Sequence, residues 1–119
     1  MSGNKYHNVR RGGFDSRREA RRYQELLLLQ RVGKIADIKR QVPFELIPAQ
    51  REPDIVGPKG GRKPGETIER SVNYVADFVY TDLDSRQLVV EDAKGVRTPE
   101  YVIKRKLMLQ KYGIRIKEV

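Results

Sequence analysis

Two short segments of this chain carry acidic residues where an apolar strand would otherwise continue. They are Val75–Tyr80, which contains Asp77, and Leu88–Gly95, which contains Asp92 and Lys94. Side chains two residues apart in a strand point to the same face, so we expect Asp92 and Lys94 to lie side by side. If Asp77 faces them from the neighbouring strand, two carboxylates could hold a divalent cation while the lysine acts on a water molecule. That arrangement is suited to hydrolysing a phosphodiester.

The apolar residues around these acids indicate that the acids lie at the margin of a core. Each aspartate shares its strand face with valine or leucine residues two positions away. A buried carboxylate without a partner is costly, so Asp77 and Asp92 need a cation or hydrogen-bond donors. Taken singly, such residues are usually ordinary surface or turn residues. Together, on adjacent strands, they favour a catalytic site, whereas Glu91 points to the opposite face and is not expected to be a ligand.

Composition favours a basic, single-domain protein that binds a polyanion. The chain has 119 residues, with 25 Lys and Arg against 16 Asp and Glu, and a net charge of +9. Such an excess indicates nucleic acid ahead of a membrane surface. The lack of cysteine excludes disulfides, a thiolate zinc site and a cysteine nucleophile, and the single histidine, His7, argues against a histidine-based nuclease. With no membrane-length apolar run and no signal-peptide pattern, we expect a soluble, cytoplasmic protein.

Local signals predict one domain over residues 1–119, with the order helix, three strands, helix, strand. Ser16 and Glu19 form a capping-box pattern that begins a helix over 17–31, which Gly33 ends. Thr98 and Pro99 begin a second helix that reaches about Tyr112. The remaining expected elements are strands over 35–46, 71–81, 86–94 and 114–119, with the second and third joined into an antiparallel hairpin.

Two segments have no apolar pattern of their own. Residues 1–13 are polar and basic and are expected to form an N-terminal arm. Residues 48–70 are predicted to form a flexible basic loop, because the stretch 57–65 consists largely of glycine, proline and basic residues. Such a loop cannot bury a core, and a length beyond that of a plain turn suggests a functional role.

The arrangement of Asp77 followed, after a hairpin, by Asp92-Ala93-Lys94 resembles the PD-(D/E)XK nuclease superfamily. The predicted element order also resembles that superfamily's core, although Ala76 stands where the motif nominally has proline. The resemblance implies an α/β fold of the restriction-endonuclease-like type, with a mixed central sheet flanked by helices. Within the superfamily, the small size and basic arm resemble phage or prophage nucleases akin to Holliday-junction resolvases. The stretches Phe14–Ala20 and Tyr74–Phe78 are similar to a small phage-associated family.

The resemblance implies a divalent-metal-dependent endonuclease that uses Mg²⁺ or Mn²⁺. The expected ligands are Asp77, Asp92 and the backbone carbonyl of Ala93, with Lys94 acting on the water or the transition state. The sequence leaves two roles open for Glu19. It is either the third residue of the capping box or the metal-binding glutamate that similar proteins carry on their first helix. Gln41 is a weaker candidate for polar support of the site.

Three clusters of basic residues, together with one lysine on the second helix, are expected to contact DNA phosphates. They are Lys5, Arg10 and Arg11 on the arm, Arg17, Arg18, Arg21 and Arg22 on the first helix, Lys59, Arg62 and Lys63 on the loop, and Lys104. Binding through such contacts should depend strongly on salt and little on sequence.

The competing hypothesis is a non-catalytic basic DNA-binding or packaging protein that retains the nuclease fold. The complete set of Asp77, Asp92 and Lys94 favours the enzyme. Cutting both strands symmetrically would favour a two-fold homodimer. If the chain is encoded by a phage or prophage, its place of action would be the cytoplasm of a bacterial host cell. The form of the DNA substrate is left open.

Overall fold

The structure, a computed structural model, describes residues 16–119 of the chain. The predictions for the arm over 1–13, including Lys5, Arg10 and Arg11, therefore lie outside the described residues. The elements that build the body are α1 (Arg17–Arg31), β1 (Ile35–Ile47), β6 (Val72–Asp82), β7 (Leu88–Asp92), α2 (Pro99–Tyr112) and β8 (Lys117–Glu118). Within residues 16–119, neither helix is long and apolar enough to cross a membrane.

The sheet is mixed, as the resemblance implied. Its strand order is β1-β6-β7-β8, with the first three strands antiparallel and β8 parallel to β7. The chain is therefore an α/β protein with one mixed sheet and two helices. The last strand is shorter than the predicted span 114–119, because Ile114 and Ile116 pack against the core cluster under α2 before pairing begins.

The helix ends form where the sequence placed them. Ser16 Oγ accepts a hydrogen bond from the Glu19 backbone N–H at 3.1 Å, which caps the start of α1. Thr98 Oγ1 does the same for the Tyr101 N–H at the start of α2. Gly113 ends α2 in the left-handed conformation that glycine adopts most easily. These local interactions fix where both helices begin and where α2 ends.

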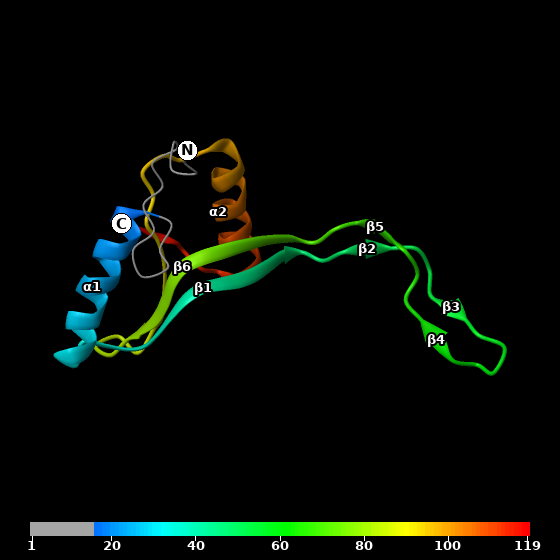
Figure 1. Cartoon of the computed structure of the whole chain (residues 1–119), viewed down its shortest axis with the longest axis horizontal. Coiled ribbons are helices and arrows are strands. Elements are labelled where there is room, and N and C mark those ends of the chain that lie inside the picture. The colour runs from blue at the N-terminus through cyan, green and yellow to red at the C-terminus, as the bar shows by residue number, and fades with distance from the viewer. Residues whose placement is uncertain (1–15) are drawn as a thin grey trace, which may run out of the picture.

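Each helix covers its own apolar cluster. Under α1, Leu26 packs with Phe78 and Tyr80 of β6. Under α2, Tyr101 and Met108 belong to the same cluster as Val79 and Val90. Figure 1 shows the two helices well apart, with the β1–β6 pair running past both. Strands β6 and β7 therefore bury both faces, one against each helix.

The β1–β6 pair changes its packing partner at Asp77. Ala76 and Phe78 are two residues apart on one strand, but Ala76 belongs to the α2 cluster and Phe78 to the α1 cluster. Opposite this point, Gln41 of β1 has a φ of 52°, in the left-handed region that a non-glycine residue rarely adopts. An unusual backbone conformation held in place by its surroundings suggests a functional position.

Beyond the body, the chain between β1 and β6 forms a long two-stranded ribbon (Figure 1). Here β2 (Gln50–Arg51) pairs with β5 (Thr67–Glu69), and β3 (Ile55–Val56) pairs with β4 (Arg62–Lys63), both antiparallel. The segment predicted as a flexible basic loop over 48–70 thus contains two short antiparallel ladders, which the prediction did not include. Backbone pairing does not require the apolar alternation on which the prediction depended, because the main-chain groups themselves make the hydrogen bonds.

Candidate active site

The register between β6 and β7 brings Asp77 and Asp92 together. Phe78 lies opposite Glu91, so the next pair in line is Asp77 and Asp92. A direct bond holds this arrangement, because the Ala93 backbone N–H donates to Asp77 Oδ2 at 2.8 Å. The structure thus places the two predicted aspartates on neighbouring strands, as expected from the hairpin.

Asp77 is in surroundings that disfavour its ionised form. Burial raises its pKa, and the nearby charge of Asp92 raises it further. The hydrogen bonds from the Ala93 N–H and the Gln41 side chain act in the opposite direction but do not cancel the shift. A cation bound between the two carboxylates would favour their ionised forms and so offset this cost.

Asp92 is almost completely buried, with 4% of its surface exposed. The Tyr74 hydroxyl donates to Asp92 Oδ2 at 2.6 Å, and Lys94 Nζ lies 3.6 Å from Oδ1. Burial and the bond to Asp92 both raise the pKa of Tyr74, which keeps its hydroxyl protonated as a donor. One oxygen of Asp92 is thus held firmly by Tyr74, while the other has only a longer contact with the lysine.

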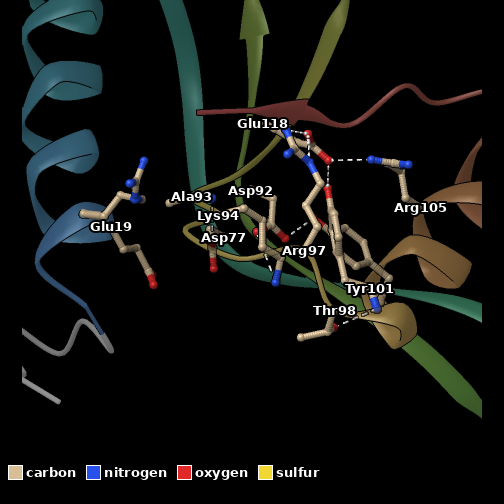
Figure 2. Close-up of polar contacts among 12 residues, drawn as sticks. Glu19, Asp77, Asp92, Ala93, Lys94, Arg97, Thr98, Tyr101, Arg105 and Glu118 are labelled. Carbon is tan, nitrogen blue, oxygen red and sulfur yellow. Dashed lines mark hydrogen bonds and ion pairs between the residues drawn. The ribbon is translucent and has the colours of Figure 1, made fainter. Parts of the chain in front are cut away.

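Tyr101 of α2 lies against Lys94, a contact that the sequence did not predict (Figure 2). Lys94 Nζ is 4.4 Å from the centre of the Tyr101 ring, within the range of a cation–π contact. The Tyr101 hydroxyl donates to Glu118 Oε2 at 2.7 Å, and Arg97 and Arg105 also bind Glu118. These bonds hold the pKa of Glu118 down at about 2, with the Arg97 bond the largest cause.

Glu19 points from α1 towards the same place. Its side chain is buried, and Gln41 Nε2 donates to Glu19 Oε2 at 2.9 Å and to Asp77 Oδ1 at 3.2 Å. One amide therefore bridges the two carboxylates. The backbone N–H of Glu19 completes the helix cap made by Ser16, while its carboxylate is bonded to Gln41 beside Asp77. The role of Glu19 as a metal ligand stays a prediction. Figure 2 shows Glu19 on the α1 side of the aspartates.

The sequence matches one known protein family. Residues 4–118 match the model of a family described as "Protein of unknown function (DUF1064)". The chain belongs to the DUF1064 family. No curated protein matches the chain, and no solved structure does. The match spans both strands of the aspartate pair and both helices that flank it, so the whole of the candidate site lies within the family's shared region.

In this DUF1064 chain, Arg22 does not lie on the exposed basic face of α1, where it was predicted, but faces the sheet. Its guanidinium makes two hydrogen bonds to the fully buried Glu91, at 2.8 and 2.7 Å. The Tyr80 hydroxyl also donates to Glu91. The bond to Glu91 raises the pKa of Arg22. Arg22 is therefore committed to a structural ion pair, because its helix position turns it towards the sheet.

The other predicted DNA-contact residues are spread over several surfaces. Arg17, Arg18 and Arg21 are exposed on α1, and the last two line a hollow of about 390 Å³ beside Arg22 and Glu25. Lys104 pairs with Glu100 at 3.4 Å on α2. The ribbon holds the remaining described members of the set, which are Lys59, Arg62 and Lys63.

The donor set of the site suits a hard divalent cation. Among residues 16–119, no group of three or more His, Cys, Asp or Glu side chains is arranged to hold a metal ion by itself. Mg²⁺, however, is commonly bound through one or two carboxylates, with water and substrate phosphate oxygens completing its shell. Asp77 and Asp92, with their mutual repulsion, fit that mode of binding.

Proposed function

We propose that this protein is a divalent-metal-dependent endonuclease that hydrolyses phosphodiester bonds in DNA. The observation that carries the proposal is the pair of Asp77, which is half-buried, and Asp92, which is buried, placed on adjacent strands with Lys94 at 3.6 Å from Asp92. The pair has more negative charge than its protein partners neutralise. On β6, Asp77 lies between Ala76, which packs in the cluster under α2, and Phe78, which packs in the cluster under α1.

Asp77 and Asp92 would hold Mg²⁺ or Mn²⁺, with the Ala93 carbonyl and Glu19 as further ligands. A bound divalent ion would lower the pKa of a water and polarise the phosphate. Lys94 would neutralise charge that develops on the phosphate oxygens in the transition state. Gln41 orients Asp77 and Glu19 through its single amide, and Tyr74 holds Asp92 by its hydroxyl. Each of these side chains thus has a distinct role.

The net charge of +9 supports DNA as the partner. The exposed arginines of α1 and the basic residues of the ribbon would contact the phosphates, together with Lys104 and the arm residues Lys5, Arg10 and Arg11. The resemblance to Holliday-junction resolvases favours branched DNA, in phage or prophage recombination within the cytoplasm of a bacterial host. A two-fold homodimer would let the enzyme cut both strands.

The competing hypothesis, a non-catalytic DNA-binding or packaging protein, is less well supported. A scaffold without chemistry would have no need for two neighbouring carboxylates, one buried and one half-buried, with a lysine beside only Asp92, since this arrangement costs stability. The complete set of Asp77, Asp92 and Lys94, with Tyr74 and Gln41 as partners, favours catalysis.

A cleavage assay on labelled DNA tests the proposal. The substrates are a four-way junction, a flap, a nicked duplex and a plain duplex, each with Mg²⁺, Mn²⁺ or EDTA. Wild type should cut at least one of them only when a divalent ion is present, and Lys94→Ala should not. Lys106→Ala, on the exposed side of α2, is the matched control and should cut like wild type. DNA binding without cleavage of any substrate would instead support the packaging hypothesis.

A further inference from the structure

The ribbon formed by residues 48–70 is held along its length by backbone hydrogen bonds. Between its two ladders, the Glu52 N–H donates to the Glu66 carbonyl at 2.9 Å. At the tip, the Gly57 N–H donates to the Gly61 carbonyl at 2.7 Å, which closes a tight turn in which Gly60 has a φ of 84°. The segment is therefore a preformed β-hairpin that extends from the sheet, rather than an irregular loop.

Gly65 shows that the two strands of the ribbon pack closely. A Cβ atom at this position would lie 2.3 Å from the Glu52 carbonyl oxygen and 2.5 Å from that of Pro53. Both neighbours are backbone atoms, so any larger residue would push the strands apart. Arg51 also donates to the Gly65 carbonyl at 3.2 Å. The sequence thus uses glycine here to allow a close approach of two backbones.

Charge is divided along the ribbon. The acidic residues lie in the half next to the body, and the tip from Ile55 to Gly65 contains three basic residues and no acid. Ile55 and Val56 are 49% and 59% exposed, and they pair with Lys63 and Arg62 across the ladder. The tip is thus a narrow strand pair that presents apolar and basic side chains together.

We propose that this tip enters a groove of double-stranded DNA, at a distance from the phosphate that the site would cut. The proposal rests on the proposed action on DNA. A two-stranded β-ribbon fits the width of the major groove. Lys59, Arg62 and Lys63 would contact phosphates along the groove, while Ile55 and Val56 supply apolar contacts of the kind that thymine methyl groups accept.

The length of the ribbon sets the length of duplex that it needs. Ten steps separate Gln50 from Gly60, and a strand rises about 3.3 Å per residue, so the tip reaches roughly 33 Å beyond the sheet. At about 3.4 Å per base pair, that distance corresponds to about ten base pairs. The substrate would therefore be DNA with a duplex flank of about ten base pairs or more beside the cut.

Binding to uncut DNA in EDTA tests this inference. The affinities of linear duplexes of about 8, 16 and 30 base pairs are measured over a range of salt concentrations. The ribbon variant replaces Lys59, Arg62 and Lys63 with Ala. The charge-matched control replaces Arg31, Lys34 and Lys106, which are exposed residues of the body. Gly65→Val is a further variant, which disturbs the ribbon without removing charge.

Wild type and the control should bind a duplex of about 16 base pairs more tightly than one of about 8, by the same factor. The ribbon variant should lose most of this gain in affinity. The ribbon variant should also lower the salt slope on the longer duplexes by about three, at roughly one per phosphate contact. Gly65→Val should reduce the gain in affinity with length although its charge is unchanged. Equal length dependence and equal salt slopes in the ribbon variant and the control would overturn the inference.

The outcomes separate this inference from the proposed activity. Loss of the length effect in a protein that cuts no DNA would reject the nuclease and keep the ribbon's role. Normal cleavage with no effect of the ribbon substitutions would reject the ribbon's role alone. If the ribbon substitutions instead abolish self-association in sedimentation experiments and leave DNA binding unchanged, the tip contacts a second copy of the chain and the inference fails.

Discussion

Asp92 and Glu91 are neighbours on β7, and both are buried, but they face opposite sides of the sheet with different partners. Glu91 receives two hydrogen bonds from Arg22 and one from the Tyr80 hydroxyl. Asp92 has the Tyr74 hydroxyl and a lysine 3.6 Å away.

The two regions differ in how their charge is balanced. At Glu91, one carboxylate meets one guanidinium in a two-bond pair, the geometry in which arginine binds carboxylates best. At Asp92, a second carboxylate, Asp77, lies on the facing strand, and its pKa is raised by burial and by Asp92. A buried acid whose charge is matched stabilises the fold, whereas an acid pair at the margin of the core with too few partners indicates a site for a ligand. The comparison predicts opposite results for mutations on the two faces.

The largest expected effect is the loss of cleavage in Lys94→Ala. The change should slow cleavage at saturating DNA by about a thousandfold, because the lysine would act on charge that develops in the transition state. DNA affinity should stay within a few-fold of wild type, since this interaction is absent from the ground state. Single-turnover cleavage and a separate binding measurement check both parts. If the mutant cuts normally, Lys94 has no catalytic role beside Asp92, and the catalytic account fails.

On the opposite face, Glu91→Gln should change stability rather than chemistry. Removing the carboxylate takes the two-bond anionic partner from the largely buried Arg22 guanidinium and leaves it only the exposed Glu25, a change that costs about 3 kcal/mol. Urea denaturation of the wild type and the mutant would measure the difference in free energy of unfolding. Glu25→Gln is the matched control, because Glu25 is an exposed partner of the same arginine and its loss should cost under about 1 kcal/mol. Equal losses from the two changes would contradict the buried ion pair.

A smaller effect is expected at Tyr101, which lies beside Lys94. Tyr101→Leu removes the ring below the ammonium and should slow cleavage about tenfold, which is the kinetic equivalent of one moderate cation–π contact. Tyr101→Phe keeps the ring and loses only the bond to Glu118, so its rate should stay within about threefold of wild type. Single-turnover rates at saturating DNA give the comparison. Equal rates for the Leu and Phe variants would show that the ring does not position the lysine.

The smallest expected effect is a change in the pH dependence of stability. The pKa of Asp77 in the folded protein is above its ordinary value of 3.8, so the folded state binds this proton more tightly than the unfolded chain does. The contribution to stability is complete below pH 3.8 and is lost as the pH rises through the raised pKa. In metal-free buffer at neutral pH, Asp77→Asn should therefore melt a few degrees above wild type, and the two should converge in acid. Thermal melts across this pH range test the sign, and a mutant that melts lower at neutral pH would contradict it.

The sequence predicted those parts of the fold that depend on neighbouring residues. Ser16, Thr98 and Gly113 act within a few residues of their own positions, so the helix ends could be predicted from capping preferences. The hairpin of β6 and β7 follows from two alternating segments separated by a short turn. Because strand pairing in such a hairpin sets which residues lie opposite one another, the placement of Asp77 beside Asp92 was predictable in the same way.

Contacts between distant residues could not be predicted in this way. Arg22 and Glu91 are 69 positions apart, and only the packing of α1 on the sheet reveals that they form a pair. The contact of Tyr101 with Lys94 depends on how α2 packs against the sheet. The one sequence signal for it was an aromatic residue in the first turn of the helix that follows Lys94. The ribbon was missed because its pairing is carried by backbone groups, for which the sequence of residues 48–70 gives no periodic sign.

The most direct test of the metal site is calorimetric titration with Mn²⁺ of wild type, Asp77→Asn and Glu118→Gln. Glu118 is an acid close to the site whose charge is already balanced by Arg97 and Arg105, so it serves as the control. We expect wild type and Glu118→Gln to bind Mn²⁺ and Asp77→Asn to lose the main site. Equal binding of Mn²⁺ by wild type and Asp77→Asn would contradict the central claim that Asp77 and Asp92 form a site for a divalent cation.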